Sequence, residues 1–371
     1  MKLGVIIEPT YRNSYWCTEI LNGLKRRTYQ RKILFTELWE DDLDKYDYVQ
    51  FQNLILVVAT SIDWINQTLA TLHDHNLRIL LAASDCPSCE SNKTSCIRMN
   101  YHSSISLLMH HLQTLGDTHT ALFGINPNSY ADNVKKEAFG KSDDIYYNFG
   151  SAATCTLQFI KSINDYDSVI CANDAVAIYL LHMLKDKNLY CSEKLHIVSF
   201  GDFFMSKLIR PTITSVSLDY YALGLQAVDT YQFLTRCDYT TSLSVMLDCK
   251  LHIRESTNRQ TYTSTSTNVE TLPRNMCVDF YNDNAIIPIL SLEKLLINAD
   301  PLDIKIIYLS IQNQSQEKIA ESLYLSLSAL RYRLKKMHSY LPNMNDKDLF
   351  AYIATYIDSE DLLAAIDLKQ K

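Results

Sequence analysis

The sequence predicts an α/β protein with two doubly wound subdomains, followed by an all-α unit, and three observations support this prediction. Short apolar runs alternate with amphipathic helical stretches over the first 200 residues. A Ser/Thr-rich segment without apolar periodicity begins near Thr257. Helical periodicity resumes near Ser291 and continues almost to the C-terminus. We therefore expect domains over residues 1–256 and 291–371, joined by a linker over residues 257–290.

Six apolar runs are expected to form strands, because buried parallel strands read as continuous Val-, Ile- and Leu-rich segments. These runs are Leu3–Ile7, Leu54–Val58, Ile79–Ala82, Ala121–Ile125, Ser168–Cys171 and His196–Phe200. The amphipathic stretches between them are Tyr15–Tyr29, Ile62–His75, His102–Gly116, Ala131–Lys141 and Ala175–Lys187. Repeated strand–helix–strand units indicate parallel sheets covered on both faces, and six or more units indicate two sequential sheets.

Composition describes an ordinary globular chain and excludes several classes of protein. The 371 residues are 47% hydrophobic and 21% charged, and the net charge of -7 argues against a chain that binds nucleic acid over its whole surface. The opening MKLGVIIEP has a short apolar run ended by Glu8 and Pro9, unlike a secretory signal. No stretch approaches the roughly eighteen apolar residues of a membrane span. We expect a cytoplasmic protein.

Ten cysteines are scattered along the chain, and reduced thiols are the expectation for a cytosolic protein. The exception to consider is Cys86, Cys89 and Cys96, with His102 as a conceivable fourth zinc ligand. Structural zinc motifs normally combine two closely spaced ligand pairs, and the sequence has no second CxxC. We therefore predict a surface loop with free thiols, no metal and no cofactor.

Polar residues follow several of the predicted strands. Asn13, Asn173 and Asp202 each come after an apolar run, and ligands of doubly wound sheets bind at the carboxyl ends of strands. Amide and carboxylate groups suit the hydroxyls of a sugar, and Tyr15 and Trp16 could stack on its face. Two other interpretations stay open, since Asn173 and Asp174 could cap the next helix and Trp16 could belong to the core.

The first 256 residues resemble the effector-binding core of LacI/GalR-type repressors. The resemblance is carried by four segments in the family's order, namely residues 3–24, 168–181, 195–224 and 253–257. It implies a type I periplasmic-binding-protein-like sensor whose chain crosses between two subdomains near residues 101, 218 and 246. It also implies that Lys135 takes the place of a ligand-binding Arg, and that a sugar or related small polar molecule is the effector. Gly201 and Leu218 depart from the family, so the fold is better supported than the specificity.

LacI-type repressors carry their DNA-binding domain before this core, whereas here the core-like segment begins at residue 3. The C-terminal residues 300–341 instead show helix-turn-helix features. Asp300 is suited to cap a helix with Pro301 at its first position, and Asn313 is suited to end that helix. A second helix is predicted over residues 316–322. Ser326 is expected to cap a third, within which Leu330, Leu334 and Met337 repeat at helical spacing.

This segment resembles, without gaps, the helix-turn-helix of LuxR/NarL-type regulators. The resemblance makes residues 326–338 the recognition helix and residues 346–357 a fourth helix that provides a dimer surface. A dense basic patch on this helix agrees with a role in binding double-stranded DNA. The side chains expected to contact DNA are Ser328, Arg331, Tyr332, Arg333, Lys335 and Lys336.

The two ends together predict a homodimeric transcription regulator with the sensor first and the DNA reader last. The alternative is a cytoplasmic solute-binding protein whose C-terminal helices mediate protein–protein contact. A solute-binding protein of the exported kind would need a signal peptide. An enzyme is the weakest interpretation, because the sequence has no Gly-rich phosphate loop and no HExxH or GxSxG motif.

Overall fold

The computed structural model describes residues 1–83, 94–149, 151–190, 194–237, 241–258, 283–342 and 344–370. The chain forms two units, each with a six-stranded sheet. The first unit contains residues 1–109, 125–143 and 217–250, and the second contains residues 110–124, 144–216 and 251–371. Both are interleaved in sequence, so the chain leaves and re-enters each of them.

The first sheet has the strand order β11-β5-β4-β3-β1-β2, and its neighbouring strands are parallel. All residues of β3 and β4 are buried, as expected for a sheet covered on both faces. The strands are β1 (Lys2–Ile7), β2 (Leu34–Leu38), β3 (Leu54–Val58), β4 (Arg78–Ala82), β5 (Thr94–Met99) and β11 (Ser244–Leu247). The helices of this unit are α1 (Tyr15–Arg31), α2 (Ile62–Asp74), α4 (Tyr130–Phe139) and α7 (Tyr220–Leu234), and the chain passes into the second unit within α3 (Tyr101–Thr114).

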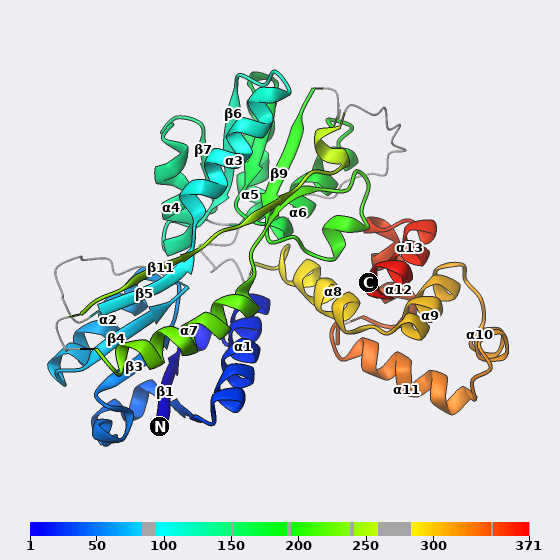
Figure 1. The fold of residues 1–371 in the computed structure, drawn as a ribbon. Helices are drawn as coiled ribbons and strands as arrows, with labels where there is room; N and C mark the ends of the chain where they lie inside the picture. Colours follow the sequence, from blue (N-terminus) through cyan, green and yellow to red (C-terminus); the bar gives the residue numbers. More distant parts are fainter. Residues whose placement is uncertain are drawn as a thin grey trace. The chain divides into compact units, whose positions relative to one another are not determined.

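Helices α1 and α7 of the first unit lie side by side (Figure 1). They approach closely because each presents a glycine at the crossing. A β-carbon on Gly23 would lie 2.2 Å from the carbonyl oxygen of Tyr221, and one on Gly224 would lie 2.2 Å from that of Ile20. Any side chain at either position would therefore force the helices apart.

The second sheet has the order β12-β10-β9-β8-β6-β7, and β6, β8, β9 and β10 pair in parallel. Its strands are β6 (Thr120–Ile125), β7 (Ile145–Tyr147), β8 (Ser168–Cys171), β9 (His196–Phe200), β10 (Thr214–Ser217) and β12 (Lys250–His252). The helices α5 (Ala152–Lys161) and α6 (Asp174–Asp186) connect these strands, and a short 3-10 helix spans Met205–Lys207.

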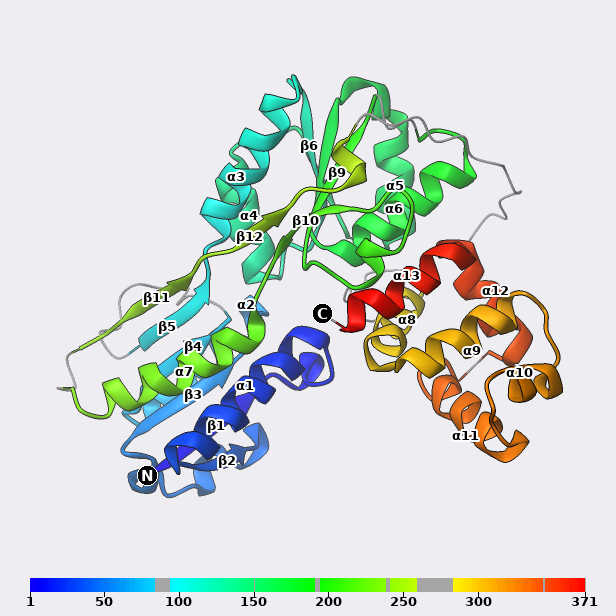
Figure 2. The same ribbon diagram turned by 45° about the vertical axis from the view of Figure 1, so that its right-hand side comes forward.

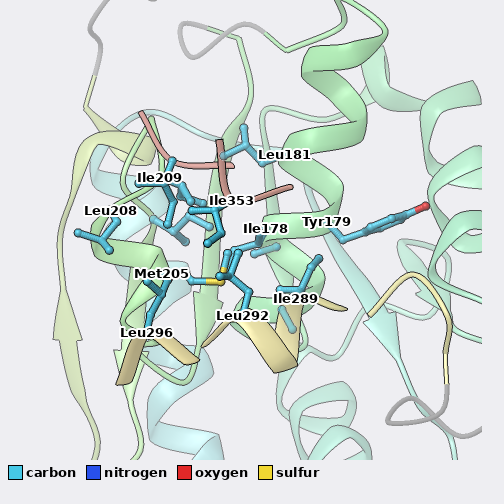
Figure 3. Packing of buried hydrophobic residues seen from close by; sticks show 14 of the residues in the cluster. Ile178, Tyr179, Leu181, Met205, Leu208, Ile209, Ile289, Leu292, Leu296 and Ile353 are labelled. Carbon is cyan, nitrogen blue, oxygen red and sulfur yellow. The ribbon is translucent and has the colours of Figure 1, made fainter. Parts of the chain in front are cut away.

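Residues 283–342 and 344–370, as described, add six further helices to the second unit. They are α8 (Ile287–Asn298), α9 (Pro301–Ile311), α10 (Gln316–Ser322), α11 (Leu327–His338), α12 (Asp346–Tyr356) and α13 (Ser359–Gln370). Apolar residues of these helices share one core cluster with residues beside the second sheet (Figure 3). In that cluster Met205 and Leu208 meet Leu292 and Leu296 of α8 and Ile353 of α12. The C-terminal helices therefore pack as part of this unit.

The predicted α/β fold class with two parallel sheets is confirmed. All six predicted strands form, and β3, β8 and β9 have the predicted bounds. One expectation about the linker is wrong at its end, because α8 begins at Ile287 with Pro288 in its first turn. The expectation that the fourth helix exposes an apolar dimer surface is also wrong. Leu349 and Ile353 of α12 are buried in the chain's own core, and the Tyr356 ring lies 4.7 Å from that of His182.

Candidate functional site

The loop after β1 carries three of the predicted effector residues, and the structure separates their roles. Ser14 caps α1 and accepts a hydrogen bond from the Cys17 amide at 3.4 Å, which fixes the start of the helix. Asn13 and Tyr15 on either side of the cap are exposed, so both can meet a ligand. Trp16 is 8% exposed and packs with Tyr11 and Tyr220, at ring distances of 5.8 and 6.2 Å. This burial favours the core interpretation of Trp16.

A charged pair that the sequence analysis missed stands at the ends of β1 and β2. The Arg12 guanidinium forms an ion pair with Glu37, and its central carbon lies 4.4 Å above the Trp39 ring. Both side chains are partly exposed, and Trp39 is 54% exposed. The position of Trp39 directly after β2 was the available signal, but β2 lacks a continuous apolar run and was not predicted. These residues place a fixed cation and an aromatic face at the carboxyl edge of the first sheet.

Lys135 of α4 is buried, which was not expected for a residue that binds a soluble effector. Its ammonium donates to Asp132 at 2.8 Å and lies 5.1 Å from the centre of the Tyr101 ring. A buried charge requires such a partner, because desolvation of an isolated ammonium is costly. Asp132 also accepts the Asn126 amide at 3.1 Å. Lys135 is therefore a cation fixed by its neighbours.

In the second unit, Asn173 follows β8 and forms the cap of α6. Its side-chain oxygen accepts the Val176 amide at 3.1 Å, which confirms the capping interpretation for this residue. Asp174 is the first residue of the helix and is completely buried. Its carboxylate accepts hydrogen bonds from the hydroxyls of Ser199 and Ser215 and from the Phe203 amide at 2.5 Å. Burial raises the pKa of Asp174, and these hydrogen bonds oppose the increase.

Asp202 follows β9 in a turn with an unusual backbone conformation. Gly201 has φ of +129° and Asp202 has φ of +53°, so the chain turns sharply out of the strand. The Asp202 carboxylate forms ion pairs with Arg254 and, at 2.9 Å, with Lys207. The Asp202 amide donates to the Ser215 hydroxyl at 3.1 Å, so the loop is attached to β10. Arg254 and Lys207 were missed because neither follows a strand-like run.

A separate cavity of about 460 Å³ lies at the opposite, amino-terminal edge of the second sheet. Its lining includes Asp117, Asp167 and His196, and His196 is held by the Asp117 carboxylate at 2.8 Å. None of the predicted effector residues lines it. The cavity is therefore distinct from the predicted effector residues.

Of the three clustered cysteines, Cys86 and Cys89 lie outside the described residues. Cys96 is a buried free thiol. Among the residues that the structure describes, no group of three or more His, Cys, Asp or Glu side chains is arranged to hold a metal ion. In the same described part of the chain, no helix is long and apolar enough to cross a membrane.

The helix-turn-helix residues form the predicted elements, with α10 and α11 joined by a short turn (Figure 2). Asp300 caps α9 in a reciprocal capping box with Asp303, and Ser326 caps α11 by accepting the Ala329 amide at 3.1 Å. Asn313 has φ of +57°, as predicted for the residue that ends the first helix. The apolar residues Ile319, Ala320, Leu330, Leu334 and Met337 are buried.

The outward face of α11 carries most of the predicted DNA contacts. The side chains on this face are all exposed, namely Ser328, Arg331, Tyr332, Lys335 and Lys336. Arg333 differs, because its guanidinium binds Asp300 at 2.8 Å and Asp303 at 2.6 Å. These contacts raise the pKa of Arg333 and tie α11 to the first turn of α9. Arg333 therefore has a structural role within the helical group.

Comparison with known proteins identifies the class of the α/β part. A model of the periplasmic binding protein-like domain matches residues 110–257. The cellobiose complex of the transcriptional regulator CelR has a TM-score of 0.58 and 14% identity, covering 69% of this chain and 84% of that one. CcpA of Lactococcus lactis has a TM-score of 0.54 and 18% identity, covering 70% and 100%. The fold is therefore that of the type I periplasmic-binding-protein-like sensors of LacI-type regulators.

One curated relative adds a sequence match. The HTH-type transcriptional regulator RegA of Clostridium saccharobutylicum is 29% identical over 99 residues, which are 27% of this chain and 30% of RegA. The match thus spans less than a third of that relative. The similar proteins named here are transcriptional regulators and not enzymes. None of them is described as a LuxR/NarL-type protein, so that resemblance of the C-terminal helices stays a prediction.

Proposed function

We propose that the protein is a DNA-binding transcription regulator controlled by a small polar effector, with α11 entering the major groove. One observation carries the proposal. A capped helix-turn-helix with an exposed basic face shares a chain with a LacI-type sensor fold. A recognition helix needs apolar residues against its own domain and polar or basic residues toward DNA. In α11, Leu330 and Leu334 are the apolar residues packed against the domain, and Arg331 and Lys335 are exposed basic residues available for DNA.

The exposed residues of α11 have different proposed roles. Arg331 is suited to read a guanine, because a guanidinium can donate two parallel hydrogen bonds to one base edge. Lys335 lies farther from the amino-terminal end of the helix and is assigned to a phosphate. Tyr332, which is 74% exposed, and Lys336 are assigned to the same interface. Arg333 is left out of it, because Asp300 and Asp303 hold its charge.

These roles are tested with a duplex that the full chain enriches from a random-sequence pool. Arg331→Ala should cost about 1–3 kcal/mol of binding free energy and relax the preference at one base pair. Lys335→Ala should weaken binding to all sequences alike and reduce the salt slope by about one unit. Fluorescence anisotropy titrations at several salt concentrations measure both quantities. Equal behaviour of the two variants would contradict the division of roles, and unchanged affinity in both would contradict the assignment of α11.

Asp202 of the second unit is proposed as an effector contact, and Asn13 and Tyr15 are proposed, independently of it, as contacts of the first unit. Solved structures with this fold include complexes with cellobiose, glucose and ribose, so these sugars are the first to test. A ligand that binds the folded state raises its melting temperature. We expect one such compound to stabilise the wild type and to have less effect on Asp202→Ala. An equal shift in both proteins would exclude Asp202 from the site.

We further propose that the regulator works as a homodimer in the cytoplasm. A helix-turn-helix dimer reads two half-sites, and two-fold symmetry of the protein then matches the symmetry of the operator. The dimer contact is not assigned to α12, because the chain itself covers the apolar face of that helix. Sedimentation of the full chain measures its oligomeric state, and a monomer at all concentrations would contradict this part of the proposal.

A further inference from the structure

The loop that follows β9 is held from two sides by buried carboxylates. Asp174 of α6 accepts the Phe203 amide at 2.5 Å. Glu293 of α8 accepts the next two amides, those of Phe204 at 2.7 Å and Met205 at 2.8 Å. Three successive backbone N–H groups therefore bind two carboxylates, one from α6 and one from α8, which are far apart in the sequence.

Glu293 is an unusual residue for the inner face of a helix. It is 2% exposed, and a buried carboxylate is costly unless its oxygens are hydrogen-bonded. Both oxygens bind amides of the loop, one each, so the carboxylate fixes the position of α8 against this loop. Leu292 and Leu296 on the same helix share the core cluster with Met205 (Figure 3). A displacement of the loop therefore requires α8 to follow or the two hydrogen bonds to break.

The loop begins at Asp202, which is the residue proposed to bind the effector. Asp202 directly precedes Phe203, and its carboxylate is paired with Arg254 and Lys207. An effector hydroxyl that binds Asp202 competes with these two cations for the same oxygens. Because Asp202 has φ of +53° in a tight turn, a change in its partners acts directly on the backbone of the next residues.

The C-terminal end of α8 connects to the helices that are proposed to bind DNA. Helix α8 ends at Asn298, and Asp300 caps α9 two residues later. Asp300 and Asp303 in the first turn of α9 bind Arg333 of α11 at 2.8 and 2.6 Å. Each step from the loop to α11 is thus a hydrogen bond, an ion pair or a short backbone connection.

We propose that Glu293 is the positioning residue through which the state of the Asp202 loop reaches the DNA-reading helix α11. The inference rests on the proposed function and adds the route of its regulation. The Asp202 loop and the DNA-binding helix can be coupled only if both affect the position of one shared element, and α8 is that element. Glu293 acts through α8 and is not assigned a contact with the effector or with DNA.

A double-mutant cycle tests the route without knowledge of the effector. The affinity for the selected duplex is measured for the wild type, Asp202→Ala, Glu293→Gln and the double variant. Asp202→Ala should change the dissociation constant by about fivefold or more in the wild-type background and by less than about twofold when Glu293 is Gln. Glu360→Gln is the matched control, since Glu360 is an exposed carboxylate on α13 of the same unit. In that background the effect of Asp202→Ala should persist in full.

The outcomes separate the inference from the proposed function. If the wild type enriches no duplex, the proposed function fails. If the wild type binds and Asp202→Ala has the same effect with and without Glu293, the route through Glu293 is wrong. A wild type that binds DNA while Asp202→Ala changes nothing also overturns the inference. A carboxylate with a merely structural role would lower the melting temperature without removing the dependence on Asp202.

Hydrogen exchange provides a second test if Glu293→Gln does not fold. Peptides covering residues 203–209, α8 and α1 are compared between the wild type and Asp202→Ala. We expect faster exchange in the loop and in α8, with α1 unchanged, because α8 is bound to the loop and α1 belongs to the other unit. Faster exchange confined to the loop would overturn the inference.

Discussion

Several buried acidic residues have specific structural partners, and these partners explain which single changes matter. Asp174 and Glu293 bind backbone amides, whereas Asp303 binds the guanidinium of Arg333. The sequence predicted the caps at Asn173, Asp300 and Ser326, because a cap depends on residues three or four positions away. It did not reveal the partner of Arg333, which lies about thirty residues earlier in the chain. Long-range pairs of this kind depend on the tertiary fold.

Glu293 should make stability depend on pH. Burial raises the pKa of Glu293 from 4.5 to about 7, although the amides of Met205 and Phe204 oppose the increase. Between these two values the folded chain holds a proton that the unfolded chain has released. The free energy of unfolding therefore falls as pH rises from about 4.5 to about 7.

Urea denaturation at about pH 5 and about pH 7 measures this effect. The wild type should lose about 2 kcal/mol more than Glu293→Gln over this interval, because Gln has no proton to release. Glu360→Gln, which removes an exposed carboxylate, should show the same change of unfolding free energy with pH as the wild type. Parallel curves for the wild type and Glu293→Gln would contradict a raised pKa.

Tyr324 in the turn before α11 is 98% exposed and has φ of +56°. This conformation costs an L-residue about 1–2 kcal/mol, while glycine loses about 0.5–1 kcal/mol of chain entropy on folding. Tyr324→Gly should therefore raise the free energy of unfolding by up to about 1 kcal/mol. Chemical denaturation measures it. Tyr332→Gly, at an exposed helical position, is the control and should have the opposite sign, so a loss of stability in both would contradict the argument.

At the scale of elements, strands with continuous apolar runs could be predicted and strands with mixed patterns could not. Strand β3 is entirely buried and was found with its observed bounds. Strand β2 is mostly half-buried, and β5 buries Thr94, Ser95 and Cys96, so neither presents a Val, Ile or Leu run. Their positions follow from pairing with neighbouring strands, which a single sequence does not show.

The crossing of α1 and α7 gives a prediction at this scale. Gly224→Ala would place a methyl group 2.2 Å from the Ile20 carbonyl oxygen, so the helices must separate. Overpacking costs about 1–3 kcal/mol, against about 1 kcal/mol that alanine gains as a helix former. We expect a net loss of up to about 2 kcal/mol in urea denaturation. Lys25→Ala, at an exposed position of α1, should change stability little, and a stabilised Gly224→Ala would show that the helices do not touch.

At the scale of the whole molecule, the C-terminal helices are joined to the second sheet by charge as well as by apolar packing. Arg210 pairs with Glu255 and with Asp361 of α13, and the Lys369 ammonium lies 5.0 Å from the centre of the Phe204 ring. The sequence predicted both the sensor and the helix-turn-helix from local patterns. It gave no sign that these helices share a core with the sensor, because that core joins residues more than one hundred positions apart. This shared core supports the proposal that the DNA-binding helices respond to changes in the sensor.

Sequence selection from a random duplex pool measures whether α11 binds DNA at a specific sequence. The full chain should enrich a sequence with two related half-sites, spaced by about one helical turn or a multiple of it. The variant with Arg331→Ala and Lys335→Ala should fold with the wild-type melting temperature and enrich no such sequence. Failure of the wild type to enrich any sequence, or equal enrichment by the variant, would contradict the proposal that α11 binds DNA.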